Sequence, residues 1–272
     1  MRLSQDQTAS TPAWQRTALV ALTGVVAGLL SGLFGVGGGL VIVPALISLV
    51  GMDQRRASAT SLAAIVVTSA VGAYSYGLHG EVSLVAVCFL VPGALVGTQL
   101  GVRLLRRLPA RVLPWVLIGF VGLVVVLQQV HVPVRDAVLV LNLWRGLALV
   151  GVGLLSGVMA GLIGVGGGSV IVPGLELAVG LGDLMARGTS LLVMLPTAIA
   201  GTWTNLRHGL ADLRAGVVVG AAAAITAPLG TWLAALVTPR QGSILFSAFL
   251  IWVASTTLLR ASRKRQHQDT PK

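Results

Sequence analysis

Glycine is concentrated in two short stretches whose backbone could bind an anion. The first contains Gly35, Gly37, Gly38 and Gly39, and the second contains Gly164, Gly166, Gly167 and Gly168. Glycine accepts positive φ and is poorly suited to a helix interior, so each stretch predicts a break between two helices. The helix that resumes after a break presents unpaired N–H groups and the positive end of its dipole, which favours an anion. The alternative is that these glycines only permit close helix crossings.

The two stretches belong to an internal duplication. Residues 32–44 read GLFGVGGGLVIVP and residues 161–173 read GLIGVGGGSVIVP, with 11 of 13 positions identical at an offset of 129 residues. The same offset aligns Thr60-Ser61-Leu62 with Thr189-Ser190-Leu191 and His79-Gly80 with His208-Gly209, without a gap. A register held over this length predicts two homologous halves.

Hydroxyl and guanidinium groups near the glycines extend the candidate anion site. The pairs Thr60-Ser61 and Thr189-Ser190 could donate hydroxyls to an oxyanion, or could instead be N-caps at a helix start. Arg187 lies two residues before the second pair, and a guanidinium can pair with a sulfonate or sulfite through two parallel hydrogen bonds. The alternative for Arg187 is an ordinary loop charge.

Glu176 is a separate candidate because it lies inside a short apolar segment, where the first half has Ile47. An ionisable residue at membrane depth is a functional candidate by default. A carboxylate would repel an anion unless protonated, so its expected role is proton coupling; the alternative is that it lies in a water-filled vestibule. The paired His79 and His208 are too few, without nearby carboxylates, to predict a metal site, and no cofactor is expected.

The elements that must position these residues are membrane helices. The 272 residues are 55% hydrophobic and only 10% charged, with a mean hydropathy of +0.91, whereas soluble domains have about 25% charged residues. The composition therefore predicts an all-α polytopic membrane protein with about 8–10 membrane segments, including two short helices beside the glycines. The single cysteine, Cys88, excludes a disulfide framework within one chain.

The expected organisation divides the chain into five parts. These are a cytoplasmic tail (1–16), a first membrane repeat (17–130), a linker (131–138), a second membrane repeat (139–259) and a basic cytoplasmic tail (260–272).

The net charge of +11 is explained by membrane topology and not by nucleic acid, because the basic residues flank apolar segments. If all five apolar elements of each half cross the bilayer, the halves are inverted and 15 of the 19 Lys and Arg residues lie on the side of the amino terminus. If the short elements re-enter instead, the split is 11 to 8. The positive-inside rule therefore favours inverted repeats, with both termini cytoplasmic.

The duplicated GVGGG…VP motif, followed about sixteen residues later by Thr-Ser-Leu, resembles the TauE/SafE family of sulfite and sulfonate exporters. The resemblance extends from about residue 17 to residue 259. It implies an integral membrane transporter of small, sulfur-containing anions. The expected location is a bacterial inner membrane. A thiosulfate-uptake family relies on several cysteines, and the lone Cys88 does not support that mechanism.

The sequence thus predicts an anion exporter that works by alternating access at the glycine breaks, with a small anion and membrane lipids as its partners. It is not expected to be an enzyme. A membrane-embedded enzyme and a scaffold or maturation factor are the alternatives, although neither a carboxylate pair nor a nucleophile cluster supports catalysis. The cargo, the direction, the coupling ion and the oligomeric state are left open.

Overall fold

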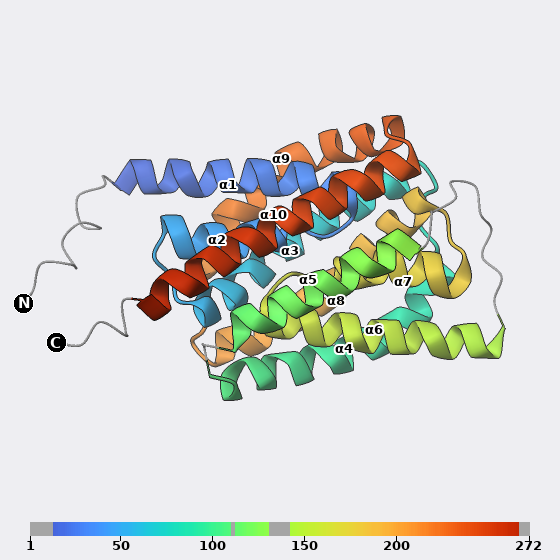
Figure 1. Cartoon of the computed structure of the whole chain (residues 1–272). Coiled ribbons are helices and arrows are strands. Elements are labelled where there is room, and N and C mark those ends of the chain that lie inside the picture. The colour runs from blue at the N-terminus through green and yellow to red at the C-terminus, as the bar shows by residue number, and fades with distance from the viewer. Residues whose placement is uncertain (1–12, 110–111, 131–141, 267–272) are drawn as a thin grey trace, which may run out of the picture.

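The computed structural model describes residues 13–109, 112–130 and 142–266, which form helices joined by short turns (Figure 1). The first half contains α1 (Ala13–Phe34), α2 (Gly39–Leu49), α3 (Gln54–Gly77), α4 (Leu84–Arg107) and α5 (Leu113–Val130). The second half contains α6 (Leu143–Ile163), α7 (Gly168–Val179), α8 (Asp183–Arg207), α9 (Leu213–Leu236) and α10 (Pro239–Gln266). No strand occurs in these described ranges, and the all-α prediction is confirmed.

Five long and four shorter apolar helices occur in the described residues, within the predicted range of membrane segments. Within the described residues, α3, α4, α6, α8 and α9 are long and apolar enough to cross a membrane, and shorter apolar helices lie in α1, α2, α5 and α7. The 11 residues of α2 cover about 16 Å, roughly half of a hydrocarbon core. The two short helices beside the glycines are therefore confirmed.

The duplication holds in three dimensions. Each of the helices α2, α3 and α4 begins 129 residues before its equivalent α7, α8 or α9. Figure 1 shows α1 and its equivalent α6 beginning at opposite ends of the bundle. The inverted orientation of the halves relative to a bilayer stays a prediction.

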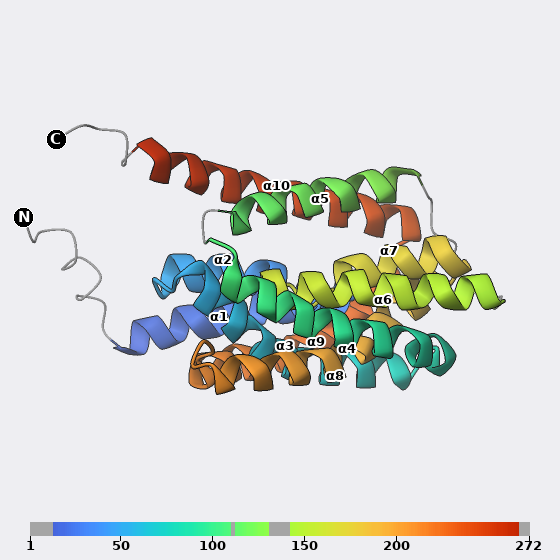
Figure 2. The same ribbon diagram turned by 90° about the horizontal axis from the view of Figure 1, so that it is seen from below.

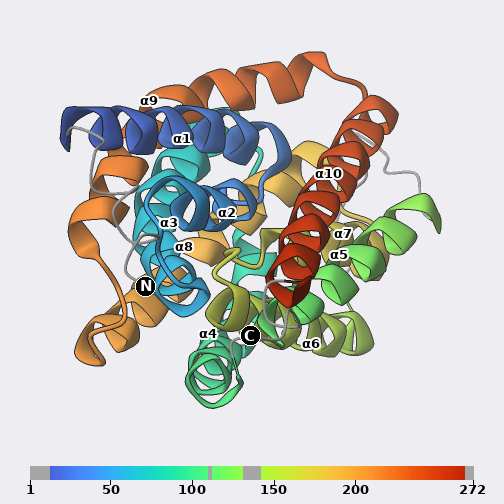
Figure 3. The same cartoon turned by 60° about the vertical axis from the view of Figure 1, so that its left-hand side comes forward.

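The halves are interleaved. Helix α1 packs along α9, α4 packs along α6, and α3 packs against α8 (Figure 3). Helices α5 and α10 lie side by side along one face of the bundle (Figure 2). The arrangement makes the interface between the halves the core of the molecule.

Glycines set the closest of these helix pairs. A Cβ at Gly28 would overlap the carbonyl oxygen of Ala223 on α9, and a Cβ at the equivalent Gly157 would overlap the carbonyl oxygen of Ala94 on α4. Small residues that allow backbones to approach are the usual basis of helix association in membranes. The close-crossing role of glycine therefore belongs to α1 and α6 as well as to the breaks.

The boundaries differ from the expected organisation at both ends. Helix α1 begins at Ala13, inside the expected amino-terminal tail, and α10 continues to Gln266, inside the expected carboxyl-terminal tail. Residues 1–12, 131–141 and 267–272, which include the expected linker, lie outside the described residues.

Candidate functional site at the junction of the two glycine breaks

The two glycine breaks meet each other at the centre of the interface. A Cβ at Gly39 would come within 2.5 Å of the carbonyl oxygen of Gly164, and a Cβ at the equivalent Gly168 would overlap the carbonyl oxygen of Gly35. Side chains are thus sterically excluded where the breaks cross. We call this region the junction. The close backbone contact explains why Gly39 and Gly168, which lie in helices, are glycines.

The remaining glycines of the junction have positive φ. The values are +69° to +76° at Gly35, Gly37 and Gly38, and +76° to +89° at Gly164, Gly166 and Gly167. This left-handed backbone is strained for other residues. It turns the chain between α1 and α2, and between α6 and α7, within a few residues.

The turn leaves backbone donors unpaired. Among the described residues, no protein acceptor pairs with five consecutive N–H groups in each break, those of residues 36–40 and 165–169. Buried N–H groups are nearly always hydrogen-bonded, so two such runs need a ligand or water. They are the donors that the sequence predicts for an anion.

Two apolar side chains fill the space beside these donors. The Met194 methyl group lies where a Cβ of either Gly37 or Gly166 would be, and Ile65 lies against the same two glycines. Ile65 and Met194 are equivalent positions, 129 residues apart, and neither is exposed. The junction is therefore closed by one residue from each half.

Ser61 and Ser190 tie each half to the break of the other. The Ser61 hydroxyl donates to the Gly164 carbonyl oxygen at 2.6 Å, and the Ser190 hydroxyl donates to the Gly35 carbonyl oxygen at 2.9 Å. Such reciprocal contacts are the mark of a two-fold relation between the halves. The serines lie at the predicted site, but their protons are engaged by the protein.

Thr60 and Thr189 are engaged in the same reciprocal way. The Thr60 hydroxyl accepts from the Asp212 N–H and the Thr189 hydroxyl accepts from the Ser83 N–H, both at 2.9 Å. Asp212 and Ser83 are the N-cap residues of α9 and α4. Each threonine therefore accepts from the N-cap N–H of a helix in the other half. In a capping box, a side chain of the same helix accepts from this N–H.

The N-cap interpretation of the Thr-Ser pairs is wrong. Helix α3 is capped by Asp53, whose side chain accepts from the Arg56 N–H at 2.8 Å, and α8 is capped by Gly182. Both pairs lie well inside these helices because the helices begin earlier than the apolar runs suggest.

Arg187 is buried in an ion pair. It is 5% exposed, donates to the Leu33 carbonyl oxygen at 2.7 Å, and lies 3.5 Å from Asp183, which is fully buried. Its backbone packs against Gly35 of the first break. Arg187 is thus beside the junction, as the sequence predicts, and the loop-charge alternative is wrong.

Glu176 lies beside Arg187, and we call Glu176, Asp183 and Arg187 the cluster. Glu176 and Arg187 line a cavity of about 10 Å³ together with Phe34 and Phe246, and Glu176 is only 6% exposed. A cavity of this size has room for about one water molecule. The water-filled vestibule interpretation does not fit this burial.

The cluster breaks the two-fold relation. The first half has Ile47, Gln54 and Ser58 where the second has Glu176, Asp183 and Arg187. Among the residues that the structure describes, buried charged side chains therefore lie on one side of the junction.

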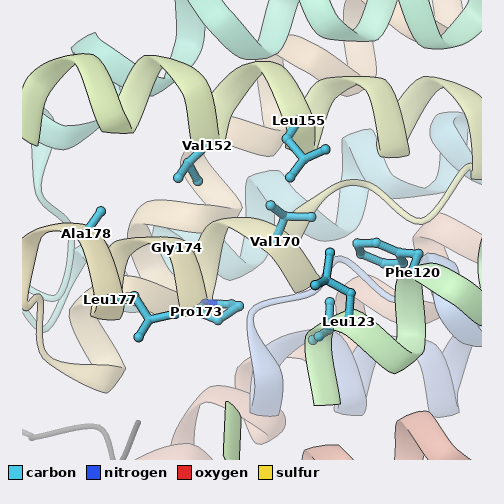
Figure 4. Close-up of a pocket in the computed structure, with 10 residues that line it drawn as sticks. Phe120, Leu123, Val152, Leu155, Val170, Pro173, Gly174, Leu177 and Ala178 are labelled. Carbon is cyan, nitrogen blue, oxygen red and sulfur yellow. The ribbon is translucent and has the colours of Figure 1, made fainter. Parts of the chain in front are cut away.

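A wholly apolar cavity lies between α5, α6 and α7 (Figure 4). It has a volume of about 280 Å³ and is lined by residues such as Phe120, Leu155 and Val170. Without a polar side chain, this cavity offers nothing to balance the charge of an anion.

Sequence reasoning missed three residues of the site. The spacing of Asp183 four residues before Arg187 could have indicated an ion pair on one helix face. Ile65 and Met194 carry no such signal, because an apolar residue in an apolar helix is unremarkable until the breaks are placed around it.

Both halves of the chain are similar to a known protein family. The family model for the sulfite exporter TauE/SafE matches residues 1–127 and 149–272. No solved structure matches the chain significantly.

Curated relatives carry transporter names. The chain is 29% identical over 208 residues to the probable membrane transporter protein YdhB of Bacillus subtilis, covering 74% of this chain and 84% of that protein. It is 33% identical over 205 residues to a probable membrane transporter protein of Haemophilus influenzae, covering 70% and 74%. A duplicated glycine-break fold that matches the family model over both halves belongs with these proteins, and the chain is therefore a membrane transporter protein of the TauE/SafE family.

Proposed function

We propose that this protein exports a small sulfur-containing anion, such as sulfite or an organosulfonate, across a bacterial plasma membrane. The cargo would bind at the junction, and alternating access would come from the two halves rocking about it. The observation that carries the proposal is the pair of unpaired N–H runs at residues 36–40 and 165–169. These donors and two helix dipoles favour negative charge at one place.

The sulfur chemistry rests on the family description, sulfite exporter TauE/SafE. Tetrahedral or pyramidal oxyanions suit a site built from many N–H donors, because each oxygen can accept more than one hydrogen bond. Export is the direction in the family's description and is part of the proposal.

The inverted arrangement is part of the same proposal. The reciprocal Ser61–Gly164 and Ser190–Gly35 hydrogen bonds support a two-fold relation between the halves. An axis in the membrane plane would place most basic residues on one side, as the charge distribution favours. Both termini would then be cytoplasmic.

Counterflow in proteoliposomes tests the proposal. Vesicles loaded with sulfite, 2-aminoethanesulfonate, sulfate or acetate are compared with protein-free vesicles, and uptake of labelled sulfite is measured. Sulfur anions should support counterflow above the protein-free level, with acetate much weaker. Equal counterflow with acetate would overturn the sulfur preference, and rates equal to those of empty vesicles would overturn anion transport.

A Met194→Trp variant tests whether the cargo passes through the junction. The larger side chain would fill the junction further, so flux should be lost if the cargo passes there. Flux that persists at the wild-type rate in a folded Met194→Trp protein would place the path elsewhere.

A further inference from the structure

Two cavities of nearly equal size lie at opposite ends of α3 and are related by the internal duplication. The first has a volume of about 330 Å³ and is lined by Arg55, Arg106, His208 and Leu210. The second has a volume of about 320 Å³, and its lining includes Leu184, Ala235, His79 and Glu81. Each residue of the first set has its equivalent, 129 residues away, in the second.

The two cavities differ in charge. Where the first has Arg55 and Arg106, the second has Leu184 and Ala235, and where the first has Leu210 the second has Glu81. We call the first the basic mouth and the second the apolar mouth. The lining of the basic mouth has two arginines and no acidic residue, so the basic mouth attracts anions. The apolar mouth has no arginine and does not attract them in this way.

The guanidinium of Arg55 is incompletely paired. Its Nη2 donates to the Leu108 carbonyl oxygen at 2.6 Å, while its Nε is buried without an acceptor. Arg106, near the end of α4, is exposed. The nearby Asp212 pairs with Arg56 and lines a different cavity, so it does not neutralise the basic mouth.

More unpaired polar groups lie inward of the basic mouth. The side-chain amide of Asn205 is fully buried without a partner, whereas the backbone carbonyl oxygen of Asn205 accepts from the backbone N–H groups of His208 and Leu210. The buried Ser58 hydroxyl has no partner either, and its backbone lies against Gly164 of the second break. Buried polar groups without partners are rare and call for an explanation such as a transient ligand or water.

Helix α3 connects the basic mouth to the junction. Arg55, Ser58, Ser61 and Ile65 follow at spacings of three and four residues, so they share one helix face. At 1.5 Å per residue, Arg55 is about 15 Å from Ile65, roughly half of the hydrocarbon thickness. The face begins with a cation, continues with hydroxyls and ends at the closing side chain.

From this arrangement we propose that the basic mouth is the site at which the anionic cargo first binds before it reaches the junction. The ligand chemistry is a small oxyanion, held by Arg55, Arg106 and His208. The apolar mouth, with Glu81, would be the side of release, because no arginine lines it to retain the cargo. This inference rests on the proposed function and adds to it a loading site and a preferred direction.

The test compares Arg106→Gln with Arg107→Gln in proteoliposomes of neutral lipid, with sulfite as the probe. Both arginines are exposed and adjacent near the end of α4, so both variants lose the same charge from the same surface, but only Arg106 lines the mouth. Arg106→Gln should raise the half-saturating sulfite concentration about tenfold, the loss expected for one charge-assisted contact. Arg107→Gln should leave it within twofold. Equal values in both variants would overturn the loading site.

A mirror variant tests the direction. Leu184→Arg combined with Ala235→Arg gives the apolar mouth the cations of the basic one, and half-saturation should then become similar from the two sides. An unchanged difference between the sides would overturn the proposed asymmetry. Arg106 is the better position for the loading-site test than Arg55, because Arg55 also donates to the Leu108 carbonyl oxygen and contributes to the fold.

A lipid headgroup presents the same oxyanion chemistry, so the measurement is repeated with phosphatidylglycerol in the vesicles. If Arg106→Gln removes a stabilisation by phosphatidylglycerol but leaves the half-saturating sulfite concentration unchanged, the mouth binds headgroups and the loading site is overturned. If no protein, wild-type or variant, moves any anion, the transport proposal itself fails. If the wild-type protein transports sulfite and all variants have the same half-saturating sulfite concentration, the loading site is overturned and the transport proposal stands.

Discussion

The Ser61 hydroxyl donates a hydrogen bond to the carbonyl oxygen of Gly164, 103 residues later in the chain, at 2.6 Å. Its equivalent, Ser190, does the same to Gly35 at 2.9 Å. Each half of the protein therefore holds the glycine break of the other. Any movement that changes the junction must either preserve these two hydrogen bonds or break them, which makes the serines a direct probe of the interface.

Replacing Ser61 or Ser190 by alanine should lower the free energy of unfolding by about 1–3 kcal/mol each, because a buried carbonyl loses its donor. The loss is measured by chemical denaturation in detergent. Ser255→Ala is the control, since Ser255 is exposed and its hydroxyl donates to the Ile251 carbonyl one turn earlier on the same helix, and it should change little. Equal losses in all three variants would contradict the interface role.

Met194→Ala should open the junction. Removing the buried side chain lowers stability by about 2–5 kcal/mol and uncovers the N–H groups beside Gly37 and Gly166. We expect faster sulfite flux with weaker discrimination against acetate, measured in proteoliposomes. Met185→Ala is a control because Met185 is half-buried and is not among the nearest neighbours of the break glycines. Unchanged flux and selectivity in a folded Met194→Ala protein would contradict a central gate.

Leucine at Gly37 or Gly166 is a less informative change. It would have to displace the Met194 methyl group and adopt positive φ at the same time. Loss of flux would then be inseparable from misfolding.

Arg187→Ala should destabilise the protein by about 3–5 kcal/mol, because Asp183 would keep a buried charge without its cation. The double variant Arg187→Ala with Asp183→Ala should recover part of that loss. Comparing the four proteins of this cycle in unfolding and in sulfite flux separates the two roles of Arg187. Full recovery of stability without recovery of flux would support cargo binding, and recovery of both would leave Arg187 a purely structural residue.

Glu176→Gln tests proton coupling. A neutral amide of the same size keeps the shape of the small cavity beside Arg187 but cannot exchange a proton. Sulfite counterflow should persist, while uptake driven by a pH gradient should be lost. Glu81→Gln, at the apolar mouth, is the control with the same chemical change. If gradient-driven uptake survives in Glu176→Gln, Glu176 is not the coupling residue.

The membrane fold follows from the sequence to a large degree. Long apolar runs with few charges allow little except membrane helices, because backbone groups in lipid must be paired within the helix. The glycines at Gly37 and Gly166 mark the breaks because only glycine accepts their positive φ. Identical residues at an offset of 129 reveal the two halves directly.

The sequence also placed Arg187 beside the second Thr-Ser pair, and the structure puts it next to the first glycine break. The local signal was sufficient to select the residue. It was insufficient to give its partner in space, since the Leu33 carbonyl that it binds is 154 residues away.

What only the tertiary structure decided is how the halves interlock. Periodicity records which residues are apolar, but α1 could pack on any apolar neighbour, and its pairing with α9 depends on the fit of glycine backbones over the whole interface. The same holds for Thr60, whose hydroxyl accepts from the Asp212 N–H of the other half rather than capping its own helix. Hydrogen bonds and gates between distant segments arise from that packing, and no local pattern encodes them.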